Sequence, residues 1–318
     1  MGNPFTGSNA GSRVQNQGNV LAKRLLLVTL VSVTVVAQES RGSDQPGVRQ
    51  VTLYVSVIDK QGNPVAGLGQ KDFKVLEENK PQVISSVKLE PDAAVSFGVL
   101  IDISRSMGGE GISLALEWLK SLAARLKSPD ELFVNAFSDE SQELVDYLAP
   151  EDYLQESLDH LGVGGQARMG LAVDLALIKL RDAHNQRRAL IFFSAGKDIA
   201  GPATLDHISR FGHPIYAVGL GGAGGVGGTL DKLKNLNLRG SALRVYAEHS
   251  GGDARFVETG AEADAALGDF CSQVKNQYRV EYTSGSNQKP GKMVKVAVKV
   301  KNPALEVRHL KRYPITSS

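Results

Sequence analysis

Cysteine and aromatic side chains are scarce in this sequence, and its positive and negative charges nearly balance. Of 318 residues, one is a cysteine, Cys271, which excludes a framework of internal disulfide bonds. The formal net charge is +2, so the charge balance gives no reason to expect a nucleic-acid partner. The six histidines show no metal-ligand spacing such as His-x-x-x-His, and the Gly-Lys-Ser/Thr sequence of a phosphate-binding loop is absent. Cys271 lies in an apolar-periodic stretch, where a buried packing role is expected.

Long hydrophobic runs are also scarce, and the one that occurs lies near the N-terminus. Lys23 and Arg24 precede an apolar run over residues 25–36, which ends at the small residue Ala37. This order predicts a secretory signal over residues 1–37 with a polar N-terminal extension. The run is shorter than the roughly 20 residues that span a bilayer, so no membrane span is expected after cleavage. We therefore expect a secreted, periplasmic or cell-envelope protein, with an uncleaved N-terminal anchor as the alternative.

The chain after the signal changes its pattern twice. Following a linker over residues 38–47, alternating apolar and polar residues predict strands with no helices between them. From residue 93 to residue 276, strand-like apolar runs alternate with helix-like stretches, which is the pattern of a parallel sheet covered by helices. Alternation of period two returns in the tail, most clearly at residues 294–301. Each β segment has too few strands to be stable alone, so we expect the two to combine.

The fold class expected is therefore α/β: a doubly wound, mostly parallel sheet with helices on both faces, inserted in a small β-sandwich formed by the two ends of the mature chain. The expected boundaries are residues 48–92 for the first half of the sandwich, 93–276 for the inserted domain and 277–314 for the second half. One expected helix of the inserted domain, over residues 171–180, carries three large apolar side chains on one face: Leu171, Leu175 and Ile178.

The most informative stretch is an apolar run over residues 97–101 that leads into Asp102, Ser104 and Ser106. A short continuous apolar run predicts a buried parallel strand, and open α/β sheets bind ligands at the carboxyl ends of such strands. One carboxylate and two hydroxyls at alternating positions suit a hard cation, Mg²⁺ or alternatively Mn²⁺ or Ca²⁺. The alternative is that these side chains only cap the following helix and hydrogen-bond the loop, as Asp and Ser often do.

The Asp-x-Ser-x-Ser pattern of residues 102–106 resembles the core of a metal-ion-dependent adhesion site, and the inserted domain resembles a von Willebrand factor A domain. The resemblance implies that a Thr and an Asp from two later loops complete the metal shell, and that a carboxylate of a partner protein supplies the last ligand. In this sequence Gln166 stands at the Thr position and Ala195 at the Asp position. The implied site is degenerate, because it has one carboxylate fewer, and Asp198 is the candidate substitute.

Four dipeptides outside the site extend the resemblance to nearly all of the mature chain. Together with the order of the elements, they resemble the VWFA-related family of exported bacterial proteins described from acidobacteria: Asp72-Phe73, Gly251-Gly252, Gln277-Tyr278 and Arg312-Tyr313. This resemblance bears on the fold more than on the function. With the metal-site pattern and the signal, we expect an exported protein-binding module of adhesion or scaffold type, with a protein ligand and without enzymatic activity. The alternatives are a structural envelope module with no metal site, and an enzyme that binds nucleotides or uses a serine.

Three further patterns bear on these alternatives. Residues 219–224 match the dinucleotide pattern Gly-x-Gly-x-x-Gly, but more glycines follow where a helix should begin, which favours a loop. Residues 194–197 match Ser-x-x-Lys of penicillin-recognising enzymes, whose Lys-Thr-Gly motif is absent. The C-terminal β segment is basic, which keeps a strand face solvated or else provides contact with anionic envelope components or a membrane surface. Its basic residues are Lys295, Lys299, Lys301, Arg308, Lys311 and Arg312.

Overall fold

The computed structural model describes residues 49–148, 161–195, 200–220, 242–286 and 288–315. The predicted signal, the linker and Asp198 lie outside these described residues. Within the described ranges, no helix is both long enough and apolar enough to cross a membrane.

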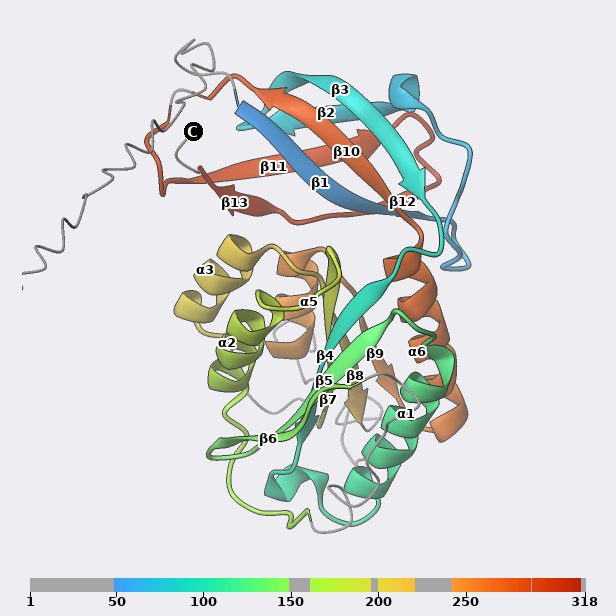
Figure 1. Cartoon of the computed structure of the whole chain (residues 1–318), viewed down its shortest axis with the longest axis vertical. Coiled ribbons are helices and arrows are strands. Elements are labelled where there is room, and N and C mark those ends of the chain that lie inside the picture. The colour runs from blue at the N-terminus through green and yellow to red at the C-terminus, as the bar shows by residue number, and fades with distance from the viewer. Residues whose placement is uncertain (1–48, 149–160, 196–199, 221–241, 287, 316–318) are drawn as a thin grey trace, which may run out of the picture. The chain divides into compact units, whose positions relative to one another are not determined.

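The centre of the inserted domain, here called the α/β body, is a sheet in the order β6-β5-β4-β7-β8-β9 (Figure 1). Neighbouring strands are parallel except β6, which runs antiparallel to β5 at the edge. The chain order reverses at β4, which lies between β5 and β7. The strands span Val95–Asp102 (β4), Glu131–Phe137 (β5), Ser141–Leu148 (β6), Arg187–Ser194 (β7), Ile215–Leu220 (β8) and Ala254–Val257 (β9).

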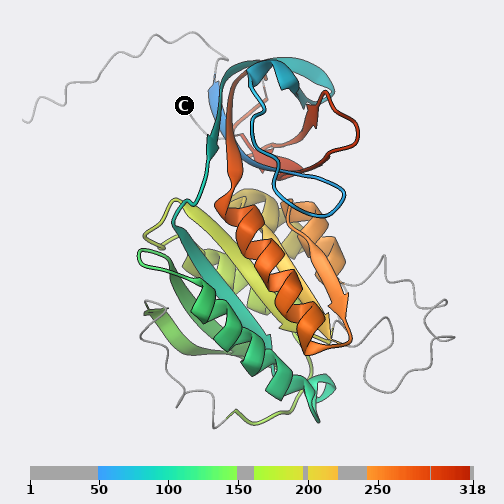
Figure 2. The ribbon, with the colours of Figure 1, turned by 90° about the vertical axis from the view of Figure 1, so that its right-hand side faces the viewer.

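Helices cover both faces of this sheet, as predicted (Figures 1 and 2). One face packs on α1 (Gly111–Arg125) and α6 (Gly260–Lys275), and the other packs on α2 (Met169–Leu180), α3 (Pro202–Phe211) and α5 (Ala242–Ser250). Each face has its own hydrophobic cluster, so the strands between them are apolar on both sides. All eight residues of β4 are buried, which explains why its sequence shows no alternation.

The apolar face that the sequence indicates on α2 is not its core face. Leu171, Leu175 and Ile178 are 44%, 43% and 45% exposed. A second row of apolar residues on the same helix packs on the sheet instead: Met169, Ala172, Val173, Ala176, Leu177 and Leu180. Because α2 is apolar on both sides, periodicity alone cannot tell which row faces the sheet.

The two ends of the described chain form a second, antiparallel sheet with the order β12-β1-β10-β3-β2-β11-β13. We call it the β domain. Its strands span Arg49–Ile58 (β1), Phe73–Glu77 (β2), Lys80–Glu90 (β3), Gln277–Ser284 (β10), Met293–Val300 (β11), Glu306–Arg308 (β12) and Arg312–Pro314 (β13). Strand β10 from the C-terminal segment lies between β1 and β3 from the N-terminal segment, so each end completes the sheet of the other.

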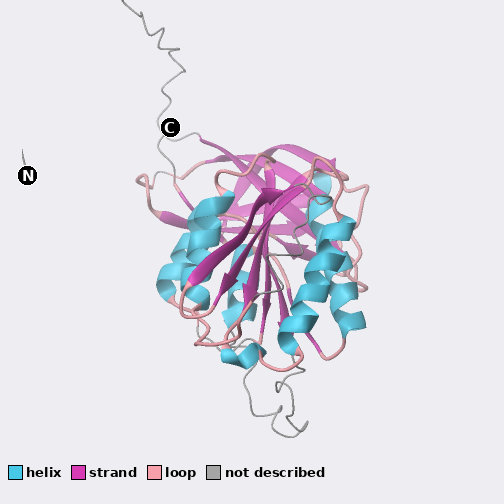
Figure 3. Ribbon diagram, turned by 60° about the horizontal axis from the view of Figure 1, so that its bottom comes forward, coloured by secondary structure: helices cyan, strands magenta, loops and turns pink. Residues whose placement is uncertain are grey.

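This arrangement bears out the β-sandwich prediction in part. The two ends do combine, but their seven strands form one continuous sheet that curls around its own core instead of two separate sheets packed face to face (Figures 1 and 3). The core inside the curl contains Tyr278, Val280 and Tyr282 of β10, and the ring of Phe73 lies 5.1 Å from that of Tyr278. A curled sheet encloses a hydrophobic interior with fewer strands than two flat layers need.

The side chain of Arg187 hydrogen-bonds both of the chain segments that connect the β domain to the α/β body. This side chain is 3% exposed and donates to the carbonyl of Val274, to the amide oxygen of Gln277 and to the carboxylate of Glu90. Glu90 ends β3 and Gln277 begins β10, so one guanidinium holds both the entry to the α/β body and the exit from it. The two connections also bond directly, because Ala93 N–H donates to the carbonyl of Lys275.

The Gly251-Gly252 motif allows a close approach at the same junction. Gly251 has φ +84°, and a Cβ at this position would lie 2.2 Å from the carbonyl carbon of His309 in the β domain. A Cβ on Gly252 would lie 2.0 Å from the carbonyl oxygen of Ile215 in β8. Both positions therefore require glycine for steric reasons, and the motif has a packing role.

Candidate functional site

Asp102 ends β4 at the position where the strand order reverses, which is where doubly wound sheets bind their ligands. The side chain is fully buried. One carboxylate oxygen accepts the N–H of Ser104 at 2.8 Å, and the other accepts the hydroxyl of Ser194, at the end of β7, at 2.6 Å. The buried charge is thus held by two protein donors from neighbouring loops.

The hydroxyl oxygens of Ser104 and Ser106 lie 2.8 Å apart, with one donating to the other. Ser104 is buried and Ser106 is half-buried, so the pair lies at the boundary between Asp102 and solvent. Neither hydroxyl caps a helix, because neither the short helix η2 (Arg105–Met107) nor α1 has a side-chain hydrogen bond at its N-cap. Helix capping does not explain the serines, although Asp102 does hydrogen-bond the loop.

The loop that contains Gln166 lies beside this pair. Gly164 N–H donates to the carbonyl of Ile103 at 2.9 Å, and Arg105 N–H donates to the carbonyl of Gly165 at 3.2 Å. Ala195 follows Ser194 directly and packs against the cluster on the α1 and α6 side. The structure therefore brings the loops after β4 and β7 and the loop before α2 to one edge of the sheet.

Sequence reasoning missed Asp139, which adds a carboxylate near this edge. It lies in the turn between β5 and β6, and its oxygen accepts the N–H of Gln166 at 3.1 Å. A Cβ on Gly165 would lie 2.3 Å from the other oxygen of Asp139. The available clue was topological, because β5 is the neighbour of β4 and its carboxyl end meets the same edge. Asp139 is exposed, so its carboxylate is also accessible to solvent.

The residues present fit a hard divalent cation in part. Neighbouring oxygens of an octahedral magnesium shell lie roughly 2.9 Å apart, given bonds of 2.0–2.1 Å. The hydroxyl oxygens of Ser104 and Ser106, 2.8 Å apart, match two such neighbouring positions. Ala195 contributes no side-chain oxygen, and the described residues contain no group of three or more His, Cys, Asp or Glu side chains with metal-site spacing. The donor set is therefore neutral hydroxyls supported by one buried carboxylate.

The rim of this edge is charged. Arg105 is exposed in the loop after β4 and Arg168 in the loop that contains Gln166, and neither forms an ion pair with a described residue. The exposed acids Asp139 and Glu140 lie in the turn between β5 and β6. Exposed arginines in these loops favour an incoming carboxylate, because arginine binds carboxylates through two parallel hydrogen bonds.

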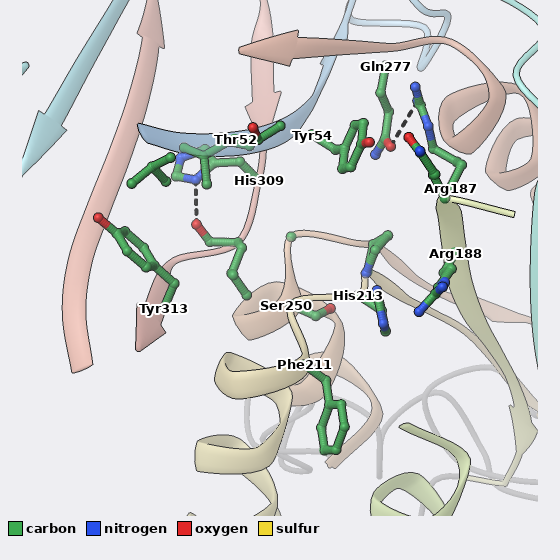
Figure 4. Close-up of a pocket in the computed structure, with 17 residues that line it drawn as sticks. Thr52, Tyr54, Arg187, Arg188, Phe211, His213, Ser250, Gln277, His309 and Tyr313 are labelled. Atoms are coloured by element: carbon green, nitrogen blue, oxygen red, sulfur yellow. Dashed lines mark hydrogen bonds between the residues drawn. The ribbon is translucent and has the colours of Figure 1, made fainter. Parts of the chain in front are cut away.

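A cavity of about 250 Å³ lies at the junction of the β domain and the α/β body (Figure 4). Its polar lining is mostly engaged: Arg188 donates to the carbonyls of Arg181, Ala183 and Asn185, and Arg187 is bonded as described above. His309 Nε2 accepts the N–H of Val298 at 3.0 Å, which requires the neutral ring. The cavity belongs to the packing of the junction, and its partnered polar groups do not converge on a common point.

Two histidines of this junction have lowered pKa values. Burial lowers the pKa of His213 to about 4, and the charge of Arg188 adds to the effect. Burial likewise lowers the pKa of His309 to about 4, with a contribution from Lys311. Both rings are therefore neutral at pH 7.

Of the two enzyme-like motifs, Ser194 and Gly219 are described, whereas residues 196–197 and 221–224 lie outside the described residues. Ser194 is fully buried and its hydroxyl donates to Asp102, so it is not presented to a substrate. Gly219 lies in β8, and a Cβ there would lie 2.3 Å from the ring of Phe256. Cys271 packs in the core, where burial raises the pKa of its thiol to about 11 and keeps it protonated.

A doubly wound sheet with one antiparallel edge strand, and an Asp-x-Ser-x-Ser loop at its switch point, define the α/β body as a von Willebrand factor A-type fold. Solved structures with this likeness include BatB from Bacteroides thetaiotaomicron, with TM-score 0.47, 16% identity and coverage of 57% of this chain and 100% of that chain. A von Willebrand factor type A protein from Catenulispora acidiphila has TM-score 0.46 and 12% identity, covering 86% of this chain and 74% of that chain.

An aerotolerance-related membrane protein from Bacteroides fragilis has TM-score 0.46 and 16% identity, and the match covers 57% of this chain and 98% of that chain. No protein-family model and no curated protein matches the sequence. At such identities the likeness concerns the fold alone, so the function has to be inferred from this chain's own residues.

Proposed function

We propose that this chain is an exported protein-binding module of adhesion or scaffold type, and that it binds its partner at the edge formed by Ser106, Gln166 and Arg105. The observation that carries the proposal is the pair of hydroxyl oxygens of Ser104 and Ser106, 2.8 Å apart beside the buried Asp102. Two converging neutral oxygens at a switch point form a ligand site that is open to solvent on one side.

A divalent cation, Mg²⁺ or else Mn²⁺ or Ca²⁺, would be held at this edge by Ser104 and Ser106, with Asp102 supplying charge from behind them. With one carboxylate in place of two, the cation keeps more of its positive charge and binds weakly to the free protein. An acidic side chain of the partner then contributes the missing charge, and Arg105 and Arg168 favour the same group. Cation and partner therefore bind cooperatively.

The experiment is a pull-down from an envelope extract with the full chain, run in Mg²⁺ and in chelator, beside calorimetric titration with Mg²⁺ and Mn²⁺. Ser106→Ala removes one hydroxyl of the pair, and Ser113→Ala, on the exposed side of α1, is the matched control. We expect capture of a partner that the chelator and Ser106→Ala each reduce at least about tenfold, a loss of about 1.4 kcal/mol. Ser113→Ala should leave capture unchanged.

The alternatives give different results. Capture that is indifferent to chelator and to Ser106→Ala points to a structural envelope module without a metal site. A thermal shift with nucleotides, or labelling of Ser104 or Ser106 by a serine-directed probe, points to an enzyme. Tight metal binding that survives Asp102→Ala contradicts the assigned site.

A further inference from the structure

The outward face of β2, β11 and β13 carries a row of cations that directly oppose one another. Lys299 of β11 lies opposite Lys74 of β2, and Lys295 of β11 lies opposite Arg312 of β13. All four side chains are exposed, whereas Val296 and Val298 of β11 point into the core. We call these four residues the cationic stripe.

Like charges directly opposite each other on neighbouring strands destabilise a sheet. No side chain of the stripe forms an ion pair with any described residue, although other cations of the β domain do. Lys301 pairs with Asp72, and Arg308 pairs with Asp253 and Glu306. The carboxylate of Glu78 accepts the main-chain N–H of Lys295 and forms no ion pair with the stripe. Within the described residues, no ion pair therefore offsets the repulsion among the four cations.

A hollow of about 300 Å³ lies at one end of the stripe. The outward side chains of Leu76 and Ala297 form its apolar part, and its rim contains Lys295 and Arg312 of the stripe and the neighbouring Lys311. His249, from the end of α5, also lines it. Burial and the charge of Arg312 lower the pKa of His249, so the positive charge of the rim comes from the lysines and Arg312. A concave site with an apolar floor and a basic rim suits an anionic group attached to an apolar surface.

The stripe alternates charge with apolar surface. Between its two cationic pairs lies the apolar pair Leu76 and Ala297, which are opposite each other on β2 and β11. Residues 295 and 299 are four positions apart, so the cationic pairs are roughly 13 Å apart at about 3.3–3.4 Å per residue. Nucleic acid places its phosphates far more densely, about 3.4 Å apart along a strand, and its single-stranded form is bound through aromatic stacking, for which the stripe has no ring.

We propose that the cationic stripe and its hollow bind a linear acidic polysaccharide, with uronate carboxylates on the two cationic pairs and the apolar face of a sugar ring on Leu76 and Ala297. The apolar pair Leu76 and Ala297 favours this ligand over polyphosphate, which has no apolar unit. The hollow beside Lys295 and Arg312, and a second one that includes Lys74, favour a chain-like ligand over a flat membrane surface. The site lies on the β domain, and it is independent of the protein-binding edge proposed above.

The test measures binding of the full chain to fluorescent polygalacturonate in low salt. Two variants remove one cationic pair each, Lys74→Gln with Lys299→Gln, and Lys295→Gln with Arg312→Gln. The matched control is Lys120→Gln with Lys127→Gln, two exposed lysines of the α/β body. We expect each stripe variant to bind at least about tenfold more weakly and the control to bind as the wild type does. Added salt should weaken wild-type binding, because exposed charges are screened.

The melting temperature of each variant is measured as well, to detect a loss of folding. Removing the opposed pair Lys74 and Lys299 relieves repulsion, so the melting temperature without polymer should stay the same or rise. Dextran of matched length, polyphosphate and vesicles containing anionic phospholipid are the comparison probes, and binding should be specific to polygalacturonate. The proposal is overturned if the stripe variants bind polygalacturonate normally, or if dextran, polyphosphate or the vesicles bind equally well.

Discussion

The buried carboxylate of Asp102 accepts hydrogen bonds from two segments of the chain, the loop after β4 and the end of β7. Asp102, Ser104 and Ser106 were identifiable because all three lie in one short pattern after an apolar run. The role of Ser194 as a donor to Asp102 and the approach of Asp139 to Gln166 depend on neighbouring strands, and no local pattern encodes them. Sequence therefore predicts the residues of one loop better than it predicts the partners that a sheet brings to them.

At this edge, Gln166→Thr combined with Ala195→Asp should strengthen Mg²⁺ binding. The double change adds a hydroxyl and a carboxylate to the loops beside Ser104 and Ser106, and affinity for a hard cation rises with ligand charge. We expect a gain of at least about tenfold by calorimetry. Ala124→Asp, which places the same charge at the far end of α1, is the control and should give no gain. An unchanged affinity in the double variant means that the loops do not share a ligand.

Arg187 should be the most costly single residue at the junction. Arg187→Met leaves the carbonyl of Val274 and the amide of Gln277 without their donor, and breaking a buried charged network costs about 3–5 kcal/mol. The measurement is urea denaturation monitored by circular dichroism. Arg181→Met is the control, because Arg181 pairs with Asp182 where both side chains are exposed, and its loss should stay within about 0.5 kcal/mol. Equal losses for the two variants would contradict a structural role for Arg187.

Among the elements, most strands and helices of the α/β body were predicted from their sequence patterns, whereas strand β13 and the core face of α2 were not. The strands and helices of the α/β body follow from apolar runs and helical spacing, because each is long enough for its pattern to be read. Strand β13 has three residues and carries no such pattern. The curl of the β domain was also hidden, because the sequence sets the inward positions of each strand and not the curvature of the whole sheet.

Helix α2 offers a direct test of which apolar row faces the core. Replacing Leu171, Leu175 and Ile178 together by Gln should lower the free energy of unfolding by less than about 1 kcal/mol, because all three are already in contact with water. Leu177→Ala, on the buried row, should cost about 2–5 kcal/mol. Urea denaturation measures both changes. A larger loss in the triple variant than in Leu177→Ala would show that the exposed row is covered in solution.

For the whole molecule, the division into an inserted body and a completing β domain could be read from the change of pattern along the chain. How the two parts hold together could not, because the junction uses single residues from distant segments: Arg187, Gly251, His309 and Gln277. The two junction histidines add a dependence on pH that composition alone does not reveal.

Acid should weaken the fold through His213 and His309. The pKa of each is lowered from the ordinary value near 6.5 to about 4, so between these values the unfolded chain binds protons that the folded protein does not. The contribution of the two neutral rings to the free energy of unfolding is therefore complete above about pH 6.5 and is lost as the pH falls towards 4. A pKa shift of this size corresponds to a change in the free energy of unfolding of up to about 3 kcal/mol for each ring.

Denaturation by urea at pH 7 and pH 4.5 measures the effect. His213→Gln with His309→Gln should reduce the difference in unfolding free energy between the two pH values. Ser113→Ala, at an exposed position without a titratable side chain, should leave that difference as it is in the wild type. If the double variant shows the full wild-type difference, the acid sensitivity arises from other groups.

The insertion of the α/β body through two bonded connections has a mechanical consequence. The described chain begins at β1 and ends just after β13, and both strands belong to the same sheet. A tensile force applied between these ends is transmitted through the backbone hydrogen bonds between strands of the β domain. The α/β body does not lie between the two points of force, because its two connections to the β domain are bonded to each other. The loops around Ser106 and Gln166 would therefore keep their conformation under tension until the hydrogen bonds between strands of the β domain break.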